Sequence, residues 1–459
     1  MHRIWALGWC GALLIGCSGG SAPGDEDAGA PSADAAEVSV LGERVAGNLS
    51  YDEAIAAARQ EVQIFWEERY PALYGGPFTE VAELRAVGPG DDIECGDERG
   101  SYRDVKGEAL YCPADDAILY DDATLFPDLH RDFGSLTNGA VLAHEWAHAV
   151  QRRSGLATSG ASTIALELQA DCFAGSWVAH VRTGTDDLFD VDTAQLAAAL
   201  SGYLTLREQS GGVAPAASTH GSAFDRVNAL QEGFEQGPSR CAAYADPVSV
   251  PQLFGTPFTS QLDPSRAGSP LADVVDDVGA DLNAFWVGRI PGFEPVTVET
   301  IPRDGQVRCG AESLRKEELG APAVYCGTDR TVLYDEMAVG DFHERIGDGA
   351  IAAYLGDAWA RAAGDALGFP IAPDEFDLTL DCLSGTWVGD LAAERRPDAL
   401  VEVLPGDLDE VVAALVASEA LRGSERDLSA FERVSAFRAG FLASADDESG
   451  PADACRRFL

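Results

Sequence analysis

The chain contains two segments with the same cysteine spacing. Cys95 and Cys112 lie 17 positions apart, and so do Cys309 and Cys326. Other segments repeat in the same order, with an offset that stays between 207 and 220 positions. The matching segments are Phe65–Trp66 with Phe285–Trp286, Glu108–Cys112 with Ala323–Cys326, Ile118–Asp121 with Val332–Asp335, Asp171–Val178 with Asp381–Val388, and Ser222–Val227 with Ser429–Val434. So steady a register indicates that the chain contains two copies of one domain.

The repeat divides the chain into two expected domains, 46–245 and 265–459, with a Pro-, Ser- and Gly-rich linker at 246–264. Each domain begins with a helical pattern, continues with short segments rich in Val, Ile and Tyr, and ends in further helical patterns. This order predicts an α+β fold, with helices packed on a small sheet. In the first domain the helical patterns cover 51–68 and lie near 138–153, 161–181 and 221–236.

Each expected domain holds four cysteines, which allow three pairings. We favour the pairing that joins the two cysteines of the 17-residue spacing, because they bracket an apparent hairpin. Closing a loop of that length contributes about 3 kcal/mol by the chain-entropy estimate. The favoured pairs are Cys95–Cys112, Cys172–Cys241, Cys309–Cys326 and Cys382–Cys455.

The first 45 residues have the features of an export signal and a tether. The apolar run Ile4–Gly16 has 13 residues, which is too short to span a bilayer but suits the core of a signal peptide over 1–16. Leu14-Ile15-Gly16-Cys17 resembles the lipobox of bacterial lipoproteins, so Cys17 is the predicted lipidation site. A plain secretory signal with an incidental cysteine is the alternative. Residues 17–45 have the composition of a flexible tether, and we expect an exported protein of the cell envelope, anchored by lipid.

The charge of the chain excludes some partners. Lys and Arg number 32 and Asp and Glu 76, so the net charge is −44. Such a chain cannot neutralise a row of phosphates, which argues against a nucleic-acid partner. It also argues against tight docking to anionic headgroups.

The sequence His144-Glu145-Trp-Ala-His148 lies inside an expected helix. Positions i and i+4 share a helix face, so the two imidazoles converge on one point. Two neutral imidazoles suit Zn²⁺, and Glu145 can act as the general base on zinc-activated water. A surface helix with this pattern by accident, or a non-catalytic site, is the alternative.

A third ligand is available on the next expected helix, where Glu167 and Asp171 are spaced i and i+4. Glu167 can complete a site of two histidines and one glutamate, with the fourth position open to water. Asp171 can accept the second ring N–H of His144 or His148 and so fix its tautomer. Two solvated acids are the alternative, but the flanking residues are apolar, and burying an unpaired acid is costly.

The second half of the chain provides an internal comparison. Aligning Trp146 with Trp359 places Asp357 opposite His144, Ala358 opposite Glu145, Arg361 opposite His148 and Asp377 opposite Glu167. The expected second domain therefore lacks both histidines and the base, and Arg361 would repel a cation. We expect one zinc per chain, in the first domain only.

His220 precedes the repeated Ser-Ala-Phe segment, and its counterpart is Asp427. This replacement suggests a catalytic role for His220, such as donating a hydrogen bond to the tetrahedral oxyanion. A histidine without a role at a helix start is the alternative. His130 and His180 have no such support, and we interpret them as surface residues.

These motifs together resemble the bacterial putative neutral zinc metallopeptidase family. The resemblance covers about residues 50–245 and rests on Ala-Leu-Tyr-Cys-Pro, Ile-Leu-Tyr-Asp, Leu-Ala-His-Glu-Trp-Ala-His-Ala-Val-Gln, Leu-Glu-Leu-Gln-Ala-Asp-Cys-Phe-Ala-Gly and Thr-His-Gly-Ser. It implies a zincin-like domain with His144 and His148 as ligands, Glu145 as base and Glu167 as third ligand, in the manner of glutamate-zincins. The family often has Gly where this chain has Ala147, a small change. The second half resembles the same family without its active site.

The sequence thus predicts an exported, lipid-anchored zinc endopeptidase that acts on proteins or peptides and carries a pseudo-enzyme domain. A zinc amidase acting on cell-wall peptides is a related possibility. The alternative from another class is a non-catalytic zinc-containing lipoprotein that binds a cell-surface or cell-wall partner. A fourth protein ligand to zinc would favour this alternative, and a water at that position would favour the enzyme.

Overall fold

The structure is a computed structural model of the chain. It describes residues 49–158, 160–184, 188–189, 191–206, 222–246, 249–250, 270–302, 304–316, 319, 321–371, 378–403, 405–422, 430–445 and 451–459. The predicted signal peptide, Cys17, most of the linker, Asp377, Asp427 and His220 lie outside these residues. Within them, no helix is both long enough and apolar enough to cross a membrane.

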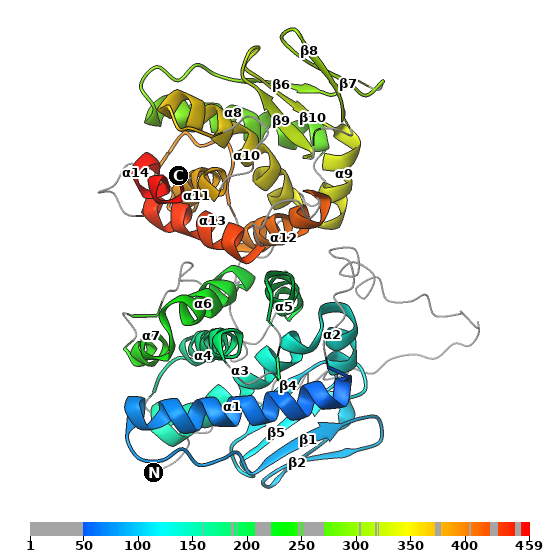
Figure 1. The fold of residues 1–459 in the computed structure, drawn as a ribbon, viewed down its shortest axis with the longest axis vertical. Coiled ribbons are helices and arrows are strands. Elements are labelled where there is room, and N and C mark those ends of the chain that lie inside the picture. The colour runs from blue at the N-terminus through cyan, green and yellow to red at the C-terminus, as the bar shows by residue number, and fades with distance from the viewer. Residues whose placement is uncertain are drawn as a thin grey trace, which may run out of the picture. The chain divides into compact units, whose positions relative to one another are not determined.

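The chain forms two compact units. Among the described residues, the first contains those from 49 to 206 and from 229 to 250, and the second contains those from 222 to 228 and from 270 to 459. Each unit combines helices with small sheets, and helices predominate (Figure 1). The predicted α+β class is therefore confirmed, while the expected domain limits stay predictions.

The first unit begins with a long helix, continues with five strands and ends in a series of helices. The elements are α1 (Tyr51–Tyr74), β1 (Glu83–Val87), β2 (Asp92–Cys95), β3 (Glu98–Ser101), β4 (Ala109–Cys112), β5 (Ala117–Asp121), α2 (Leu125–Phe133), α3 (Ser135–Ser154), α4 (Thr163–Thr183), α5 (Thr193–Thr205), the part of α6 (Ala223–Gln236) from Ala229 onwards, and α7 (Pro238–Ala242).

The main sheet of the first unit has the strand order β1-β5-β4. Strand β5 lies in the middle, parallel to β1 and antiparallel to β4. All five residues of β5 are buried, as expected for a strand that is covered on both faces. Strands β2 and β3 form a separate hairpin, which the Cys95–Cys112 disulfide links to β4.

Helix α3 is the central helix of the first unit. It packs against α1, α4 and α5 and against strand β4 (Figure 1). The core between α1 and α4 is aromatic, because the Trp66 ring meets the Phe173 ring edge-on at 4.8 Å between centroids. Such pairs stabilise a core beyond the area they bury.

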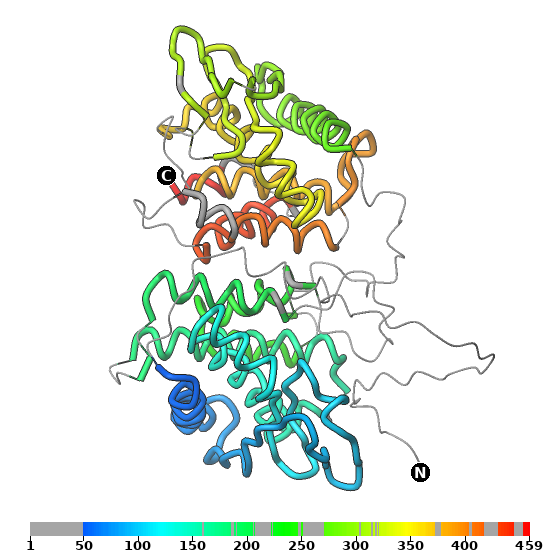
Figure 2. The backbone as a smooth tube through the Cα atoms, turned by 90° about the vertical axis from the view of Figure 1, so that its right-hand side faces the viewer, coloured from blue at the N-terminus to red at the C-terminus, as the bar shows by residue number. Residues whose placement is uncertain are grey.

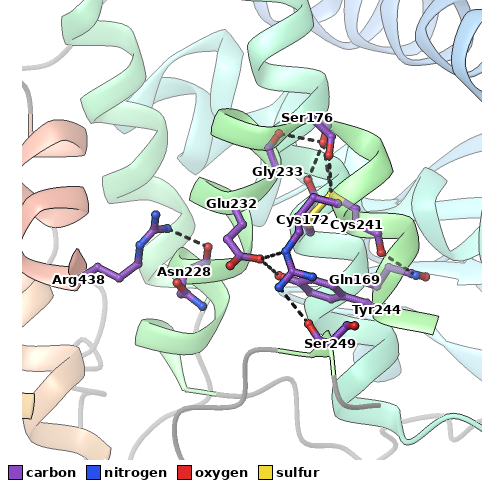
Figure 3. Close-up of polar contacts among 12 residues, drawn as sticks. Gln169, Cys172, Ser176, Asn228, Glu232, Gly233, Cys241, Tyr244, Ser249 and Arg438 are labelled. Carbon is purple, nitrogen blue, oxygen red and sulfur yellow. Dashed lines mark hydrogen bonds and ion pairs between the residues drawn. A yellow bond between two sulfur atoms is a disulfide. The ribbon is translucent and has the colours of Figure 1, made fainter. Parts of the chain in front are cut away.

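Helices α4 and α6 approach each other closely at two glycines. A Cβ atom on Gly175 would lie 1.8 Å from the Leu230 carbonyl oxygen, and one on Gly233 would lie 1.7 Å from that of Cys172. Only a residue without a side chain permits this backbone contact. Ser176 exploits it by donating a 3.0 Å hydrogen bond to the Gly233 carbonyl oxygen (Figure 3).

The Cys172–Cys241 disulfide holds α7 against α4 near this crossing (Figure 3). The buried amide of Gln169 donates to the Cys241 carbonyl oxygen at 3.0 Å. On the other side of α7, the Tyr244 hydroxyl donates to Glu232 of α6 at 2.8 Å. These contacts fix α4, which carries two of the predicted site residues.

The second unit has the same order of helices and strands at its start. Its elements are α8 (Leu271–Arg289), β6 (Thr297–Thr300), β7 (Gln306–Cys309), β8 (Glu312–Arg315), β9 (Ala323–Cys326), β10 (Thr331–Tyr334), α9 (Glu336–Arg345), α10 (Asp348–Leu367), α11 (Leu378–Ala392), α12 (Pro405–Arg422), α13 (Ala430–Ala445) and α14 (Pro451–Cys455).

The second unit also repeats the sheet and the helix crossing of the first. Its main sheet has the order β6-β10-β9, with β10 parallel to β6 and antiparallel to β9. Helix α10 packs against α8, α11 and α12 (Figure 2). At the crossing of α11 and α13, a Cβ on Gly385 would lie 2.1 Å from the Phe437 carbonyl oxygen, and one on Gly440 would lie 1.8 Å from that of Cys382.

The structure joins the eight cysteines of the two units in four disulfides. These are Cys95–Cys112, Cys172–Cys241, Cys309–Cys326 and Cys382–Cys455. All four are the pairs that the sequence favours, and none joins the two units.

Helices α1 and α3 differ from the sequence prediction in their limits, and two helices were not predicted. Helix α1 ends at Tyr74, beyond the predicted end at Glu68. Helix α3 begins at Ser135, three residues before the predicted start, because Asn138 is buried in the helix and its amide donates to the Phe126 carbonyl oxygen at 3.0 Å. Helices α2 and α5 were not predicted, although α5 contributes a residue to the site described next.

Candidate metal centre

Helix α3 places the two histidines of the motif side by side. The Nε2 atoms of His144 and His148 are 3.2 Å apart, and the two rings are nearly perpendicular, at 86°. Both residues lie in the half of the helix that precedes Gly155, which ends it in a left-handed conformation with φ 83°. The i, i+4 spacing therefore brings two ring nitrogens to one point, as the sequence predicts.

Glu167 reaches the same point from helix α4. Its Oε2 lies 3.3 Å from Nε2 of His144, and its Oε1 lies 3.6 Å from Nε2 of His148. Among the described residues, these three side chains form the group of His, Cys, Asp and Glu that could hold a metal ion, with ligand atoms within 4.8 Å of one another.

The distances among these atoms suit zinc. Ligands about 2.0–2.1 Å from a tetrahedral ion lie about 3.4 Å from one another. The two Nε2 atoms, 3.2 Å apart, and Oε2 of Glu167, 3.3 Å from Nε2 of His144, are close to this value. The other carboxylate oxygen, Oε1, lies 3.6 Å from Nε2 of His148. Two imidazoles and one carboxylate are also a common ligand set for Zn²⁺. The residues present therefore fit the metal that the motif implies.

Asp171 holds the first histidine. It lies one turn after Glu167 on α4, is fully buried, and places Oδ1 2.7 Å from Nδ1 of His144. The hydroxyl of Tyr203, from α5, donates to the same Oδ1 at 2.5 Å and lies 3.2 Å from Nδ1 of His144. With its Nδ1 proton donated to Asp171, His144 directs the lone pair of Nε2 towards His148 and Glu167.

Gln151 holds the second histidine. Its Oε1 lies 2.9 Å from Nδ1 of His148, and its Nε2 donates to the Leu166 carbonyl oxygen at 2.7 Å. Gln151 is almost fully buried. This amide therefore orients the ring of His148 and ties the motif helix to α4 just before Glu167.

The charges around the histidines raise their pKa values in the metal-free protein. Burial alone would lower the pKa of His144, but Asp171, Glu167 and Glu145 outweigh it and raise that pKa to about 10. The pKa of His148 is also raised, because Glu167 and Glu145 outweigh burial and the neighbouring His144. A metal ion must displace these protons before it can bind.

The structure places the remaining predicted residues as follows. Glu145 is buried on α3, directly beside His144. His220 and Cys17 lie outside the described residues. His130 and His180 are half-buried rather than fully exposed, with their rings 5.6 Å from Tyr51 and 5.4 Å from Phe65, respectively.

Two site residues were missed by sequence reasoning. Gln151 lies three positions after His148 on the same helix, so helical spacing alone could have identified it. Tyr203 is 32 positions from Asp171, on a helix whose apolar sequence Thr193–Thr205 indicates only burial. No spacing rule connects Tyr203 to the motif.

The corresponding positions of the second unit are occupied differently. Asp357, Ala358 and Arg361 lie on α10. Asp381, which matches Asp171 in the repeat, forms a bidentate ion pair with Arg433, with Nη2–Oδ1 2.6 Å and Nε–Oδ2 2.9 Å. In this unit Arg433 contacts the buried carboxylate, while in the first unit His144 and Tyr203 contact that of Asp171.

Comparison with known proteins finds one matching family and several similar proteins. Residues 95–244 match the family described as putative neutral zinc metallopeptidase. The chain is similar to the uncharacterized protein YpfJ of Escherichia coli (strain K12), at 32% identity over 168 residues, which are 32% of this chain and 58% of YpfJ. It is also similar to the uncharacterized protein Rv2575 of Mycobacterium tuberculosis (strain ATCC 25618 / H37Rv), at 32% identity over 161 residues, which are 30% of this chain and 55% of Rv2575.

The chain thus spans little more than half the length of these curated relatives. No solved structure matches it. The matched segment contains His144, Glu145, His148 and Glu167, and the resemblance predicted from the motifs is confirmed there: residues 95–244 match the putative neutral zinc metallopeptidase family.

Proposed function

We propose that this protein is a zinc-dependent metalloendopeptidase whose active site lies in the first unit. One observation carries the proposal: the Nε2 atoms of His144 and His148 lie 3.2 Å apart, close to an edge of a zinc tetrahedron, and each has one oxygen of the Glu167 carboxylate beside it, at 3.3 and 3.6 Å. The family match over residues 95–244 suggests a metalloprotease and agrees with this chemistry.

Each residue has a role in this proposal. When bound, zinc supplies a Lewis acid that makes water nucleophilic at neutral pH. His144, His148 and Glu167 would hold it, and with three protein ligands a fourth position is open to water or substrate. Glu145 is the general base: it accepts the proton from the attacking water and delivers it to the leaving amine.

The neighbours of the ligands keep this arrangement in place. Asp171 and Gln151 each contact the Nδ1 atom of one histidine, at 2.7 and 2.9 Å. Both rings therefore present Nε2 without further reorientation, which reduces the cost of forming the site. His220 would donate a hydrogen bond to the tetrahedral oxyanion, as its replacement in the second half of the sequence suggests.

We further propose that the second unit is a homologous domain without the metal site. The shared strand order, the matching disulfides and the matching glycine crossings support a common origin. At the three motif positions it has Asp357, Ala358 and Arg361, of which only the aspartate could ligate zinc. The protein would therefore bind one zinc per chain.

We also propose that the protein is exported and anchored by a lipid on Cys17. The support is the apolar run, the lipobox-like sequence before Cys17 and the four disulfides, which are typical of an oxidising compartment. Its substrates would then be proteins or peptides of the cell envelope or its surroundings. The strongly acidic chain would favour neutral or basic segments among them.

Cleavage of casein and of a peptide library by the full chain tests the proposed activity. We expect internal peptide bonds to be cut by the zinc-loaded protein, and Glu145→Gln to reduce turnover by at least about a hundredfold while zinc remains bound. Glu67→Gln makes the same change at an exposed position of α1 and should have no effect. Bound zinc without cleavage by the unchanged protein would instead favour the non-catalytic lipoprotein.

A further inference from the structure

Helix α5 contributes a buried tyrosine to the neighbourhood of the metal ligands. Tyr203 is 2% exposed, and its hydroxyl donates to Oδ1 of Asp171 at 2.5 Å. The same hydroxyl lies 3.2 Å from Nδ1 of His144, which itself lies 2.7 Å from Oδ1 of Asp171. The three atoms thus form a closed triangle on the side of His144 that faces away from the other ligands.

This triangle restricts the orientation of His144. A carboxylate held by a single hydrogen bond can rotate about its χ2 angle, because the terminal torsion of Asp is broad. The hydrogen bond from Tyr203 adds to the contact of His144 on the same Oδ1 and restrains the rotation of the Asp171 carboxylate. The fixed carboxylate in turn fixes the His144 ring, so that Nε2 stays directed at His148 and Glu167.

Another buried tyrosine in the same unit shows what a purely structural contact looks like. The hydroxyl of Tyr102 donates to Oδ1 of Asp121 at 2.8 Å. Asp121 is also fully buried, but it accepts its other hydrogen bonds from groups of the turn that follows it, such as the Ala123 amide, and from the Gly107 amide. The carboxylate of Asp121 therefore stabilises the local backbone, whereas the carboxylate of Asp171 contacts the candidate metal ligand His144.

A glycine allows α5 to come close enough for this contact. Gly202 directly precedes Tyr203, and a Cβ atom there would lie 2.5 Å from Cγ2 of Thr137 and 3.0 Å from Cγ of Phe133. Helix α5 packs against both α2 and α3. A larger residue at position 202 would therefore push α5 away from the motif helix and take the hydroxyl out of reach of Asp171.

We propose that Tyr203 is a positioning residue of the zinc site, which acts through Asp171 on the ring of His144. The inference rests on the proposed zinc site and extends it to a helix outside the sequence motif. It makes the docking of α5, through Gly202, a condition for tight zinc binding. Loss of a group that orients a metal ligand in this way typically weakens metal affinity tenfold to a hundredfold.

Zinc affinity of the full chain tests this proposal without any assay of cleavage. The dissociation constant is measured by competition with a chromophoric chelator for the unchanged protein, Tyr203→Phe and Tyr102→Phe. We expect Tyr203→Phe to weaken zinc binding roughly tenfold to a hundredfold, and Tyr102→Phe to leave it unchanged. The visible absorption spectrum of the Co²⁺-substituted protein should also change in Tyr203→Phe, since the orientation of one imidazole ligand changes.

Two further variants separate positioning from general packing. If Tyr203 acts through Asp171, Asp171→Ala with Tyr203→Phe binds zinc no more weakly than Asp171→Ala alone. Gly202→Ala alone should weaken zinc binding. In a protein that already carries Tyr203→Phe, it should cause no further loss of zinc affinity. Unchanged zinc affinity and an unchanged Co²⁺ spectrum in Tyr203→Phe would overturn the role of Tyr203 but not the zinc site. An unchanged protein that binds no zinc would overturn both.

Discussion

Arg433 presents its guanidinium to both carboxylate oxygens of Asp381, at 2.6 and 2.9 Å, inside the second unit. Both side chains are 5% exposed. In the first unit the matching carboxylate of Asp171 is contacted by His144 and Tyr203. The same position in the repeat therefore contacts a histidine of the candidate metal centre in one unit and an arginine in the other.

Removal of the guanidinium should destabilise the second unit strongly. Arg433→Met leaves Asp381 as an uncompensated buried charge, and breaking a buried pair in this way costs about 3–5 kcal/mol. Denaturant unfolding of the full chain measures this loss. The free energy of unfolding is taken from the transition whose midpoint the substitution shifts. Arg59→Met removes an exposed pair with Glu80 and should cost less than about 1 kcal/mol.

A second variant distinguishes charge burial from lost packing in the same experiment. Replacing both partners with apolar residues, as Arg433→Met with Asp381→Leu, should recover most of the lost stability. If the double variant is as unstable as the single one, the buried charge is not the cause.

The crossing of α4 and α6 should tolerate no side chain at Gly175. An added methyl group would lie 1.8 Å from the Leu230 carbonyl oxygen, and because this is backbone, the helices must move apart. We expect Gly175→Ala to lower the free energy of unfolding by about 3 kcal/mol, at the upper end of overpacking costs. Thermal and denaturant unfolding measure the effect.

Gly288→Ala is the matched control. Position 288 lies on an exposed face of α8, where a Cβ atom would meet nothing within 4 Å. There the change should stabilise the protein by up to about 1 kcal/mol, since alanine favours helix more than glycine does. A Gly175→Ala protein as stable as the Gly288→Ala protein would refute the close crossing.

The metal-free first unit should lose stability as the pH rises from about 6.5 to about 10. The folded pKa of His144 is raised to about 10, mainly by Asp171 and Glu167 against the effect of burial, while an unfolded histidine titrates near about 6.5. In this window the folded state binds a proton that the unfolded state has released. The contribution is therefore complete below about pH 6.5 and disappears as the pH passes the folded pKa.

Denaturant unfolding in the presence of a chelator, at pH 6 and at pH 9, measures this dependence. The difference between the unchanged protein and His144→Gln isolates the contribution of one group. We expect the free energy of unfolding to fall more steeply with pH in the unchanged protein than in His144→Gln. Equal pH dependence in the two proteins would show that His144 does not bind the additional proton of the folded state.

Parts of the site could be predicted from the sequence because they depend on local geometry. The i, i+4 spacing of His144 and His148 needs only a helix, and Glu167 lies one helix further along the chain. The cysteine pairs were favoured correctly because the two cysteines 17 positions apart bracket an apparent hairpin, which leaves one other pair in each expected domain.

Other parts depend on tertiary packing, which spacing does not reveal. Helix α5 is almost uniformly apolar, so its sequence has no 3.6-residue alternation to indicate which face turns towards Asp171. The start of α3 was placed too late because Asn138, a common capping residue, instead donates its amide to the Phe126 carbonyl oxygen inside the core.

The zinc content of the full chain tests the central claim most directly. Native mass spectrometry, combined with elemental analysis, should find one zinc per chain in the unchanged protein and none in His144→Ala with His148→Ala, while Asp357→Ala keeps its zinc. Zinc retained by the double-histidine variant, or a second zinc lost on changing Asp357, would contradict a single site in the first unit.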